Sequence, residues 1–308
     1  MIKYKTIFAY CMAIMYLSMH FIVSFTSIDT NIKRDNVKIL NFKSKKLLNY
    51  DENVLINKLK TQSHIRLEIK PQGLRIDGVS QHKKYNLKNT TQKYYSQIQQ
   101  DKIVSSLLNI SNGLFVEAGA YDGETHSNTL YLERFKNWTG LLIEPSMENY
   151  KILLSKNRKA YSINSCLSSG NKSRRSRFIE AGPFGVTTNQ TTTTDSYNVL
   201  CHPLEKILDY FFKEIKRNDR IIDYMSLDIE GNEKSVLESF NWSKYKFKLL
   251  TIEYNQNVNF YNWVKKYLDQ FGYVEIVVDD VWYQDVYLAH SSFFNNFNLT
   301  KVSDYILV

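Results

Sequence analysis

The sequence is poor in cysteine and lacks several motifs that identify enzyme classes. Only three of its 308 residues are cysteines (Cys11, Cys166 and Cys201), and no Cys/His spacing typical of a metal centre occurs. No serine stands in the strand–turn–helix motif of hydrolase nucleophiles. The complete G-x-G-x-x-G dinucleotide fingerprint is also missing. These absences argue against a Cys/His metal site and a serine hydrolase, so the chemistry must be sought in other residue types.

One long segment near the start has no charged side chain. Residues 6–28 contain no Asp, Glu, Lys or Arg, and they follow a short tail, residues 1–5, that carries Lys3 and Lys5. The segment is long enough to cross a bilayer. No small-x-small cleavage site follows, because Phe25 would occupy the −3 position. We expect an uncleaved transmembrane signal anchor, with a cleaved signal peptide as the alternative. Basic residues are nearly balanced on its two sides and mildly favour a cytosolic C-terminus.

Residues 29–93 carry the basic charge of the chain. Their net charge equals the +9 of the whole sequence, so the remainder is close to neutral. The simplest interpretation is a solvated, partly disordered stem. An alternative is an electrostatic patch for anionic glycans or lipid headgroups. We expect no nucleic-acid partner, because no aromatic–basic platform accompanies the charge.

From Tyr94 onward, apolar runs that fit strands alternate with segments that fit helices. We expect strands at 114–116, 138–145, 160–167, 197–201, 224–229, 247–254, 273–278 and 281–288, and helices at 96–109, 127–135, 147–157, 204–215, 233–240 and 262–271. Residues 168–196 are expected to form an irregular loop or lid. Strands alternating with helices predict an α/β fold with a doubly wound, mostly parallel sheet and right-handed crossovers.

The first strand leads into a turn that suits a nucleotide-containing ligand. Gly119 and Gly123 stand in this turn together with Glu117 and Asp122. Glycines at a strand-to-helix turn allow close approach of the backbone to a ligand, although an ordinary β-turn-α connection has the same appearance. The next strand closes at Glu144, the position from which a carboxylate can accept both hydroxyls of a ribose.

Three acids are expected at the same edge of the sheet. Asp228 and Glu230 follow the strand at 224–229, and Glu253 ends the strand at 247–254. Open α/β sheets bind ligands at the carboxyl ends of their strands. Any of the three could act as a base toward a hydroxyl group. Together they could hold a divalent cation, but strand-end placement alone also produces such a trio, and we predict no metal site.

Four segments, VEAGAYDGETHSNTLYLE, WTGLLIEPS, CHPLEKIL and SLDIEG, resemble the FkbM-type methyltransferases, a branch of the class I S-adenosylmethionine (SAM) enzymes. The likeness spans roughly residues 95–290 and is stronger to animal membrane-anchored members related to the Star protein. It implies a Rossmann-like sheet of seven strands with the last one antiparallel, and SAM as the cofactor. Residues 94–308 would form this domain.

The resemblance also assigns roles to individual residues. Glu117 would orient the loop or reach the cofactor's ammonium group through water, and Glu144 would bind the ribose. Asp228 would lie nearest the transferred methyl group, or else cap the next helix. His126 is a lesser candidate for the base. The remaining predicted cofactor contacts are Gly119, Ala120, Asp122 and Gly123 on the methionine and ribose side, and Cys166 and Leu167, within the stretch 165–167, on the adenine side.

The sequence thus predicts a membrane-anchored, SAM-dependent O-methyltransferase, and the resemblance points to a sugar hydroxyl of a glycan or glycoprotein as the acceptor. The alternative is a non-catalytic Star-like protein that escorts membrane-protein cargo between endoplasmic reticulum, Golgi and endosome. Seven N-x-S/T sequons and the resemblance favour a lumenal domain in the secretory pathway. There Cys166 and Cys201 are a candidate disulfide; in cytosol they would be reduced core residues. The oligomeric state is not predicted.

Overall fold

The computed structural model describes residues 74–79, 82–188, 196–276 and 284–293. The predicted anchor at 6–28 and most of the stem lie outside these ranges. None of the helices within the described ranges is long and apolar enough to span a bilayer.

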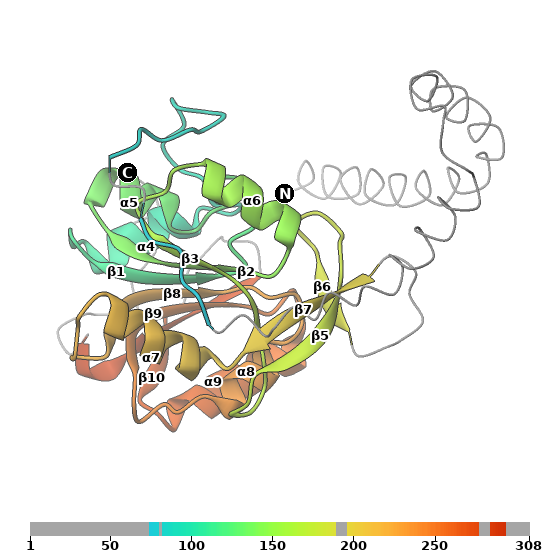
Figure 1. The fold of residues 1–308 in the computed structure, drawn as a ribbon. Coiled ribbons are helices and arrows are strands. Elements are labelled where there is room, and N and C mark those ends of the chain that lie inside the picture. Colours follow the sequence, from blue (N-terminus) through green and yellow to red (C-terminus); the bar gives the residue numbers. More distant parts are fainter. Residues whose placement is uncertain (1–73, 80–81, 189–195, 277–283, 294–308) are drawn as a thin grey trace, which may run out of the picture. The chain divides into compact units, whose positions relative to one another are not determined.

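A seven-stranded sheet forms the centre of the domain, with the strand order β10-β11-β9-β8-β1-β2-β3 (Figure 1). The strands are β1 (Leu114–Ala118), β2 (Thr139–Glu144), β3 (Tyr161–Asn164), β8 (Ile221–Leu227), β9 (Lys246–Glu253), β10 (Tyr273–Ile276) and β11 (Asp285–His290). β11 is antiparallel to both of its neighbours, whereas the pairs from β9 to β3 are parallel. The predicted mostly parallel α/β sheet, with its last strand antiparallel, is confirmed.

Helices cover both faces of this sheet. α4 (Gln100–Leu108), α5 (Leu130–Lys136) and α6 (Met147–Ser155) lie on one face, and α7 (Leu204–Glu214), α8 (Glu233–Ser239) and α9 (Val258–Asp269) lie on the other (Figure 1). β1 shows why two layers are needed: Phe115 packs into one hydrophobic cluster, while Leu114 and Val116 pack into the opposite one. A strand with both faces apolar is stable only when both faces are covered.

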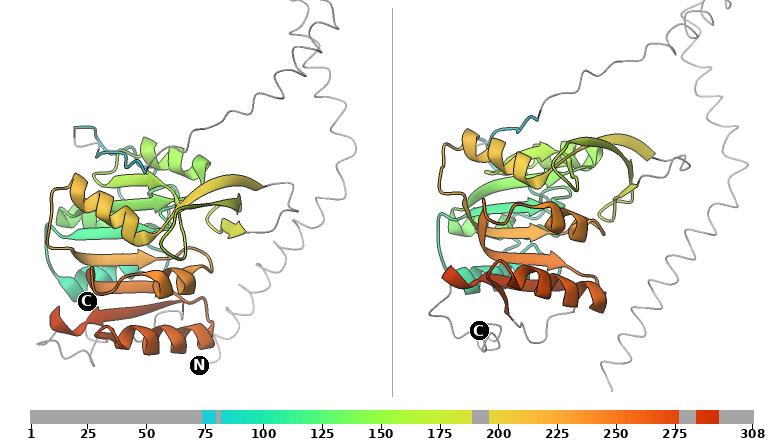
Figure 2. Two further views of the ribbon diagram at one scale, coloured as in Figure 1. Left: turned by 60° about the horizontal axis from the view of Figure 1, so that its bottom comes forward. Right: turned by 90° about the horizontal axis from the view of Figure 1, so that it is seen from below.

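The described part of the segment 168–196, which is residues 168–188 and 196, contains strands and is not an irregular loop, so this prediction was wrong. A second sheet, ordered β4-β7-β5-β6, contains β4 (Cys166–Leu167), β5 (Arg174–Ile179), β6 (Val186–Thr188) and β7 (Ser196–His202), and it lies to one side of the main sheet (Figures 1 and 2). In β5, Ser176 and Phe178 are buried between more exposed neighbours, a pattern of period two. Phe178 packs on Val199 and on both cysteines, so the segment has a small core of its own.

The predicted strand at 160–167 is divided between the two sheets at Ser165. The Ser165 N–H donates to the Glu144 carbonyl in the main sheet, and its hydroxyl donates to the Leu200 carbonyl in the second sheet. Beyond this switch, Cys166 and Cys201 are register partners in the parallel β4–β7 pair and form a disulfide, with their Cα atoms 4.3 Å apart. The disulfide that the sequence offered as one of two possibilities is therefore present in the structure.

Part of the segment assigned to the stem packs on the domain. Asp77 pairs with Ser162 beside β3, and Leu87 is buried in the core. The backbone N–H groups of Lys88 and Asn89 each donate to the carboxylate of Glu124 at 2.9 Å. The packed region thus extends N-terminal of Tyr94, where the sequence placed the start of the domain.

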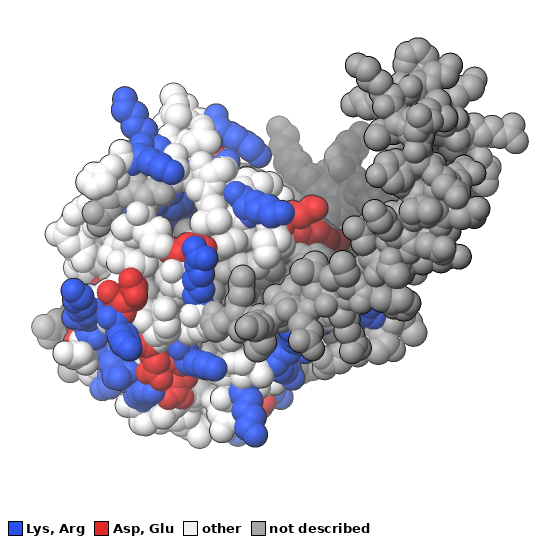
Figure 3. Space-filling view, in the orientation of Figure 1, with Lys and Arg blue, Asp and Glu red and all other residues white. Residues whose placement is uncertain are grey.

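Charged side chains are mixed on the surface of the domain. On the face drawn in Figure 3, Lys and Arg side chains are spread over the surface, and Asp and Glu side chains lie next to some of them. A small network has Lys244 paired with both Glu205 and Asp209, and Asp209 also pairs with Arg220. The interspersed charges fit the near-neutral balance that the sequence assigns to this part of the chain.

Candidate active site

A pocket lies at the carboxyl ends of the central strands, where the parallel topology was expected to place a ligand. We call it the first pocket. The loop after β1, the end of β2, β4, the β5–β6 hairpin and the loop after β8 contribute its walls. Its lining residues are Gly119, Tyr121, Ile143, Glu144, Pro145, Ser165, Cys166, Leu167, Phe178, Gly182, Pro183, Gly185, Thr187, Asp228, Ile229, Glu230 and Asn232. The second sheet therefore forms one side of the pocket.

Gly119 is required by the main chain that crosses beside it. Its φ is +89°, and a Cβ atom at this position would lie 1.8 Å from the carbonyl oxygen of Asp228. The Asp228 N–H in turn donates to the carbonyl of Ala118 at 3.1 Å. Only a residue without a side chain allows this approach. The glycine that was predicted to admit a ligand thus also fixes the loop after β1 against the start of the loop after β8.

Three other predicted contacts in this loop shape the turn. Asp122 Oδ1 accepts the N–H groups of Glu124 (2.9 Å) and Thr125 (2.7 Å). Gly123, with φ +77°, packs against Leu153 of α6. Ala120 is buried and donates its N–H to the Ile143 carbonyl. None of these three is among the residues that line the first pocket.

Glu117 holds the loop and does not line the first pocket. Its buried carboxylate accepts hydrogen bonds from the Ser127 hydroxyl, the Asn128 N–H and the Thr129 hydroxyl. Burial raises its pKa, while the charge of Arg158 and these hydrogen bonds act in the opposite direction. Residues 127–129 make these hydrogen bonds with the Glu117 carboxylate. The helix α5 therefore begins at Leu130 and not at Ser127 as predicted. Two roles were predicted for Glu117, orienting the loop and reaching the cofactor's ammonium group, and the structure shows the first of them.

Glu144 stands in the first pocket with a fixed orientation. Its Oε2 accepts the Tyr121 N–H at 2.8 Å, and its Oε1 accepts the Ser146 N–H at 2.7 Å. Burial raises the pKa of this carboxyl to about 8, and the nearby charge of Glu180 adds to the shift. Each oxygen can accept a further hydrogen bond. The position and the free lone pairs suit the predicted binding of two hydroxyl groups.

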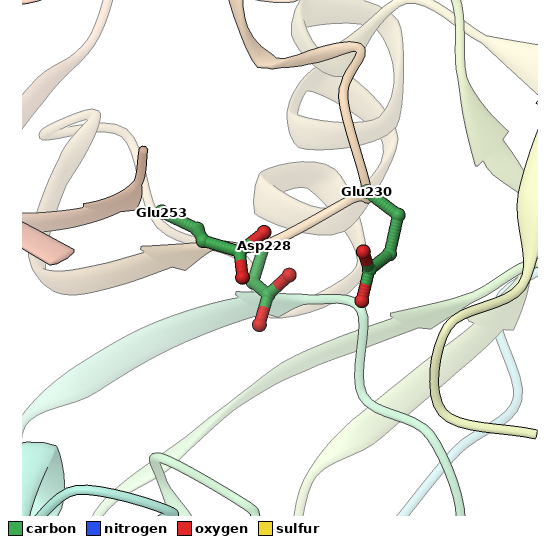
Figure 4. A group of neighbouring side chains, drawn as sticks. All are labelled: Asp228, Glu230 and Glu253. Carbon is green, nitrogen blue, oxygen red and sulfur yellow. The ribbon is translucent and has the colours of Figure 1, made fainter. Parts of the chain in front are cut away.

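The three acids of the sheet edge are brought together, as Figure 4 shows. Asp228, Glu230 and Glu253 each offer a carboxylate oxygen, and these atoms all lie within 4.8 Å of one another. Burial, and then the charge of Glu253, raise the pKa of Asp228 well above its usual range. Burial and the charge of Glu230 raise the pKa of Glu253 to about 7. At least part of this group is therefore protonated near neutral pH.

A second pocket shares Glu230 with the first. It is lined by Glu230, Gly231, Glu233, Lys234, Glu253, Tyr254, Asn255, Asn257 and Phe260. Glu230 lines both pockets, Asp228 lines only the first, and Glu253 lines only the second. The carboxylates thus stand where the two cavities meet. Glu230 has a left-handed backbone, with φ 58°, and Glu233 supports this turn by accepting the N–H groups of Ile229 and Gly231.

Several features of the site were not predicted from the sequence. Tyr121 lines the first pocket from a left-handed backbone with φ 47°, a conformation that tyrosine seldom adopts. Thr187 of β6 accepts a hydrogen bond from the Asn232 amide at 2.6 Å, which ties the hairpin to the loop before α8. Cys166 and Leu167 do line the first pocket. His126 lies outside the lining of both pockets and pairs with Ser96.

The fold is that of the Rossmann-like methyltransferases, a mixed α/β fold with a large, mostly parallel sheet. A model of the family described as the Methyltransferase FkbM domain matches residues 117–275, just over half of the chain. The chain therefore belongs to this family, as its sequence motifs predicted. No curated protein matches the chain.

Three solved structures illustrate the similarity. Methyltransferase FkbM from Methylobacillus flagellatus has a TM-score of 0.36 and 16% identity, over 57% of this chain and 43% of that one, so the match spans less than half of its length. Precorrin-6y C5,15-methyltransferase from Geobacter metallireducens has a TM-score of 0.34 and 11% identity, over 61% and 85%. TrmK from M. capricolum, in complex with S-adenosylhomocysteine (SAH), has a TM-score of 0.33 and 12% identity, over 62% and 67%.

Proposed function

We propose that this protein is a SAM-dependent O-methyltransferase. The observation that carries the proposal is the group Asp228, Glu230 and Glu253, which stands where two separate pockets meet. A group-transfer enzyme needs this arrangement, because two ligands must approach a common point from different sides. Membership of the FkbM methyltransferase domain family supplies the reaction class.

The first pocket fits SAM. Glu144 has a carboxylate held by two backbone N–H groups and still able to accept hydroxyl donors. Ile143, Leu167 and Phe178 provide an apolar wall on the same side, as an adenine ring requires. We assign ribose binding to Glu144 and adenine contact to the β4 end with Phe178. Gly119 and Tyr121 are assigned to the loop side. SAM supplies an activated methyl group when it is bound.

The acid group is assigned to proton transfer. A hydroxyl acceptor must lose its proton as the methyl group is transferred, and an effective base has a pKa near the working pH. Glu253, with its pKa raised to about 7, satisfies this condition. Asp228 lies between Glu253 and the first pocket, so we assign it to aligning the reacting hydroxyl and sharing the proton.

The second pocket is the proposed acceptor site, and we propose a sugar hydroxyl of a glycan as the acceptor. Phe260 offers an aromatic surface, while Asn255, Asn257 and the carboxylates offer several hydrogen-bonding groups. This combination suits a polar ligand with apolar C–H faces.

We further propose a membrane-anchored location with the domain in the lumen of the secretory pathway. The disulfide Cys166–Cys201 supports this proposal, because disulfides persist in oxidising compartments. The sequon residues Asn89, Asn109, Asn137, Asn171 and Asn241 are exposed, so the fold leaves room for glycans at each. Sequons at Asn189 and Asn298 lie outside the described residues.

Transfer of a labelled methyl group tests the function. The full-length chain is incubated with methyl-labelled SAM and secretory glycoproteins, and the glycans are then released from the polypeptide. Label in the released glycan supports the proposal, and Asp228→Asn should abolish most of it. Label in the deglycosylated polypeptide would contradict a sugar acceptor. Absence of label despite SAM binding would favour the alternative, a non-catalytic Star-like protein that escorts cargo.

A further inference from the structure

Glu230 is the member of the acid group to which the proposed proton transfer gives no role of its own. Among the described residues, it alone lines both pockets. One of its carboxylate oxygens lies within 4.8 Å of a carboxylate oxygen of Asp228 (Figure 4). Its carboxylate has no hydrogen-bond or ion-pair partner within the described ranges. A ligand that enters either pocket can therefore reach a carboxylate that the fold itself does not use.

The backbone at Glu230 is held in an unusual conformation. Its φ is 58°, in the left-handed region that residues with long side chains seldom adopt. The carboxylate of Glu233 accepts the N–H groups of Ile229 at 2.9 Å and Gly231 at 3.1 Å, and these hydrogen bonds hold the turn on both sides of Glu230. Strained backbone that is maintained by its surroundings is typical of ligand sites. The turn thus fixes Glu230 at the place that the two pockets share.

The surroundings of Glu230 contain little positive charge. The described lining of the first pocket includes three carboxyl groups and no Lys, Arg or His. In the described lining of the second pocket the one basic residue is Lys234. Its Nζ lies 3.9 Å from the carboxylate of Glu238 and 4.9 Å from the centre of the Trp263 ring. Lys234 is therefore engaged elsewhere, and the site favours a ligand that brings its own positive charge.

We propose that Glu230 is a specificity-determining residue, which attracts the positively charged sulfonium of SAM and so distinguishes this cofactor from its neutral product, SAH. The inference rests on the proposed function. The methyl group must be reached from both pockets, so it lies beside the residue that they share. During transfer the C–S bond breaks and its electron pair stays on sulfur, while the acceptor hydroxyl gives its proton to Glu253. Sulfur thereby becomes neutral, the attraction to Glu230 is lost, and SAH is released more easily.

The competing explanation is that Glu230 only occupies a position in the turn before α8. Changing a residue with this structural role would disturb the turn and weaken all ligands of the first pocket equally. Changing a residue that recognises charge would weaken only the ligands that are positive next to it. The two explanations therefore differ in their dependence on the charge of the ligand, which can be varied while the adenosine part stays the same.

The experiment compares three ligands by calorimetric titration of the full-length chain: SAM, SAH and sinefungin, in which a carbon bearing an ammonium group replaces the methylated sulfur. Burial and the charge of Glu233 raise the pKa of Glu230, so the titrations are made above neutral pH. Wild type should bind SAM and sinefungin about tenfold more tightly than SAH, because an unneutralised carboxylate attracts a nearby cation. Glu230→Gln should bind all three ligands as weakly as wild type binds SAH.

Three further variants keep the test decisive. Glu230→Asp retains the charge and should retain the preference for the two cationic ligands. Glu230→Asn removes the charge with a side chain that tolerates the left-handed backbone, and it should behave like Glu230→Gln even if that variant folds poorly. Glu148→Gln, which changes an exposed acid on α6, should bind all three ligands like wild type.

Three results would overturn the role of Glu230 while leaving the proposed function intact. The first is a wild-type protein that binds SAH as tightly as SAM. The second is an unchanged preference for SAM in Glu230→Gln and Glu230→Asn. The third is equal weakening of both variants toward all three ligands. A wild-type protein that binds none of the three ligands would overturn both proposals.

Discussion

The carbonyl oxygen of Asp228 lies against Gly119 so closely that a Cβ atom there would approach it to 1.8 Å. This contact joins the loop after β1 to Asp228, and both Gly119 and Asp228 line the first pocket. In the proposed function, cofactor binding and acceptor alignment therefore depend on the same close backbone packing. Changes at Gly119 should disturb both.

Gly119→Ala should destabilise the domain by about 2–4 kcal/mol, since the added methyl group meets backbone atoms and the residue has a positive φ. Gly170→Ala is the matched control: it also has a positive φ, 79°, but no atom lies within 4 Å of the added Cβ. That variant should lose only about 1 kcal/mol. Denaturant unfolding of both variants measures the difference, and equal losses would show that the contact with Asp228 is unimportant.

Glu144→Ala should lower the affinity for SAM by roughly 2–4 kcal/mol, because the hydrogen bonds between its carboxyl group and the ribose are lost in a closed site. Glu148→Ala, an exposed acid on α6, serves as the control and should bind normally. Calorimetric titration gives both affinities. Unchanged affinity in folded Glu144→Ala would mean that its carboxylate only holds the N–H groups of Tyr121 and Ser146.

Asp228→Asn should keep its affinity for SAM yet transfer the methyl group at least about a hundredfold more slowly, if Asp228 aligns or deprotonates the acceptor. The affinity for SAM and the rate of methyl transfer should both be measured on the same preparation of the variant, and compared with wild type. Full activity of this variant would shift the role to Glu230 or Glu253, and Glu253→Gln would then be the variant to test.

The stability of the ligand-free domain should fall as the pH rises. The pKa of Glu144 is raised from 4.5 to about 8 in the folded state, mainly by burial, so folding favours its protonated form. Its contribution is fully present below pH 4.5 and is lost as the pH rises through about 8. Free energies of unfolding measured across this range should decline less steeply in Glu144→Gln. A wild-type stability that rises over the same range would contradict this.

The disulfide should be intact in protein purified from cells. Closing the loop between Cys166 and Cys201 stabilises the fold by about 3–4 kcal/mol in the chain-entropy model. Mass mapping after alkylation should find both cysteines unmodified without reductant and modified after reduction. If both are alkylated without reductant and every sequon is unglycosylated, the domain belongs in the cytosol and the proposed topology is wrong.

Much of the main sheet was predictable because its strands are apolar runs closed by acids. Glu144, Asp228 and Glu253 were placed at a common edge for one reason: the carboxyl ends of parallel strands lie on the same side of a sheet. Their contacts with the two pockets follow from that topology. This part of the site needed no knowledge of long-range packing.

The second sheet was missed because its stability comes from distant partners. β5 reads as a basic, polar stretch, and Phe178 finds its core only when Val199 and the disulfide are beside it. The role of Glu117 was left open because its hydrogen-bond partners, residues 127–129, were predicted to belong to a helix. The effect of Glu180 on the pKa of Glu144 gave no sequence signal, because only the fold brings the two carboxyl groups near each other.

Binding of SAM to the full-length protein, measured by calorimetric titration, tests the proposed function most directly. We expect saturable binding at one site per chain, strongly weakened in Glu144→Ala and retained in Asp228→Asn. Absence of binding at about 1 mM SAM, in a preparation whose disulfide is intact, would contradict it. The first pocket would then not be a cofactor site, and a non-catalytic role in membrane-protein transport would take its place.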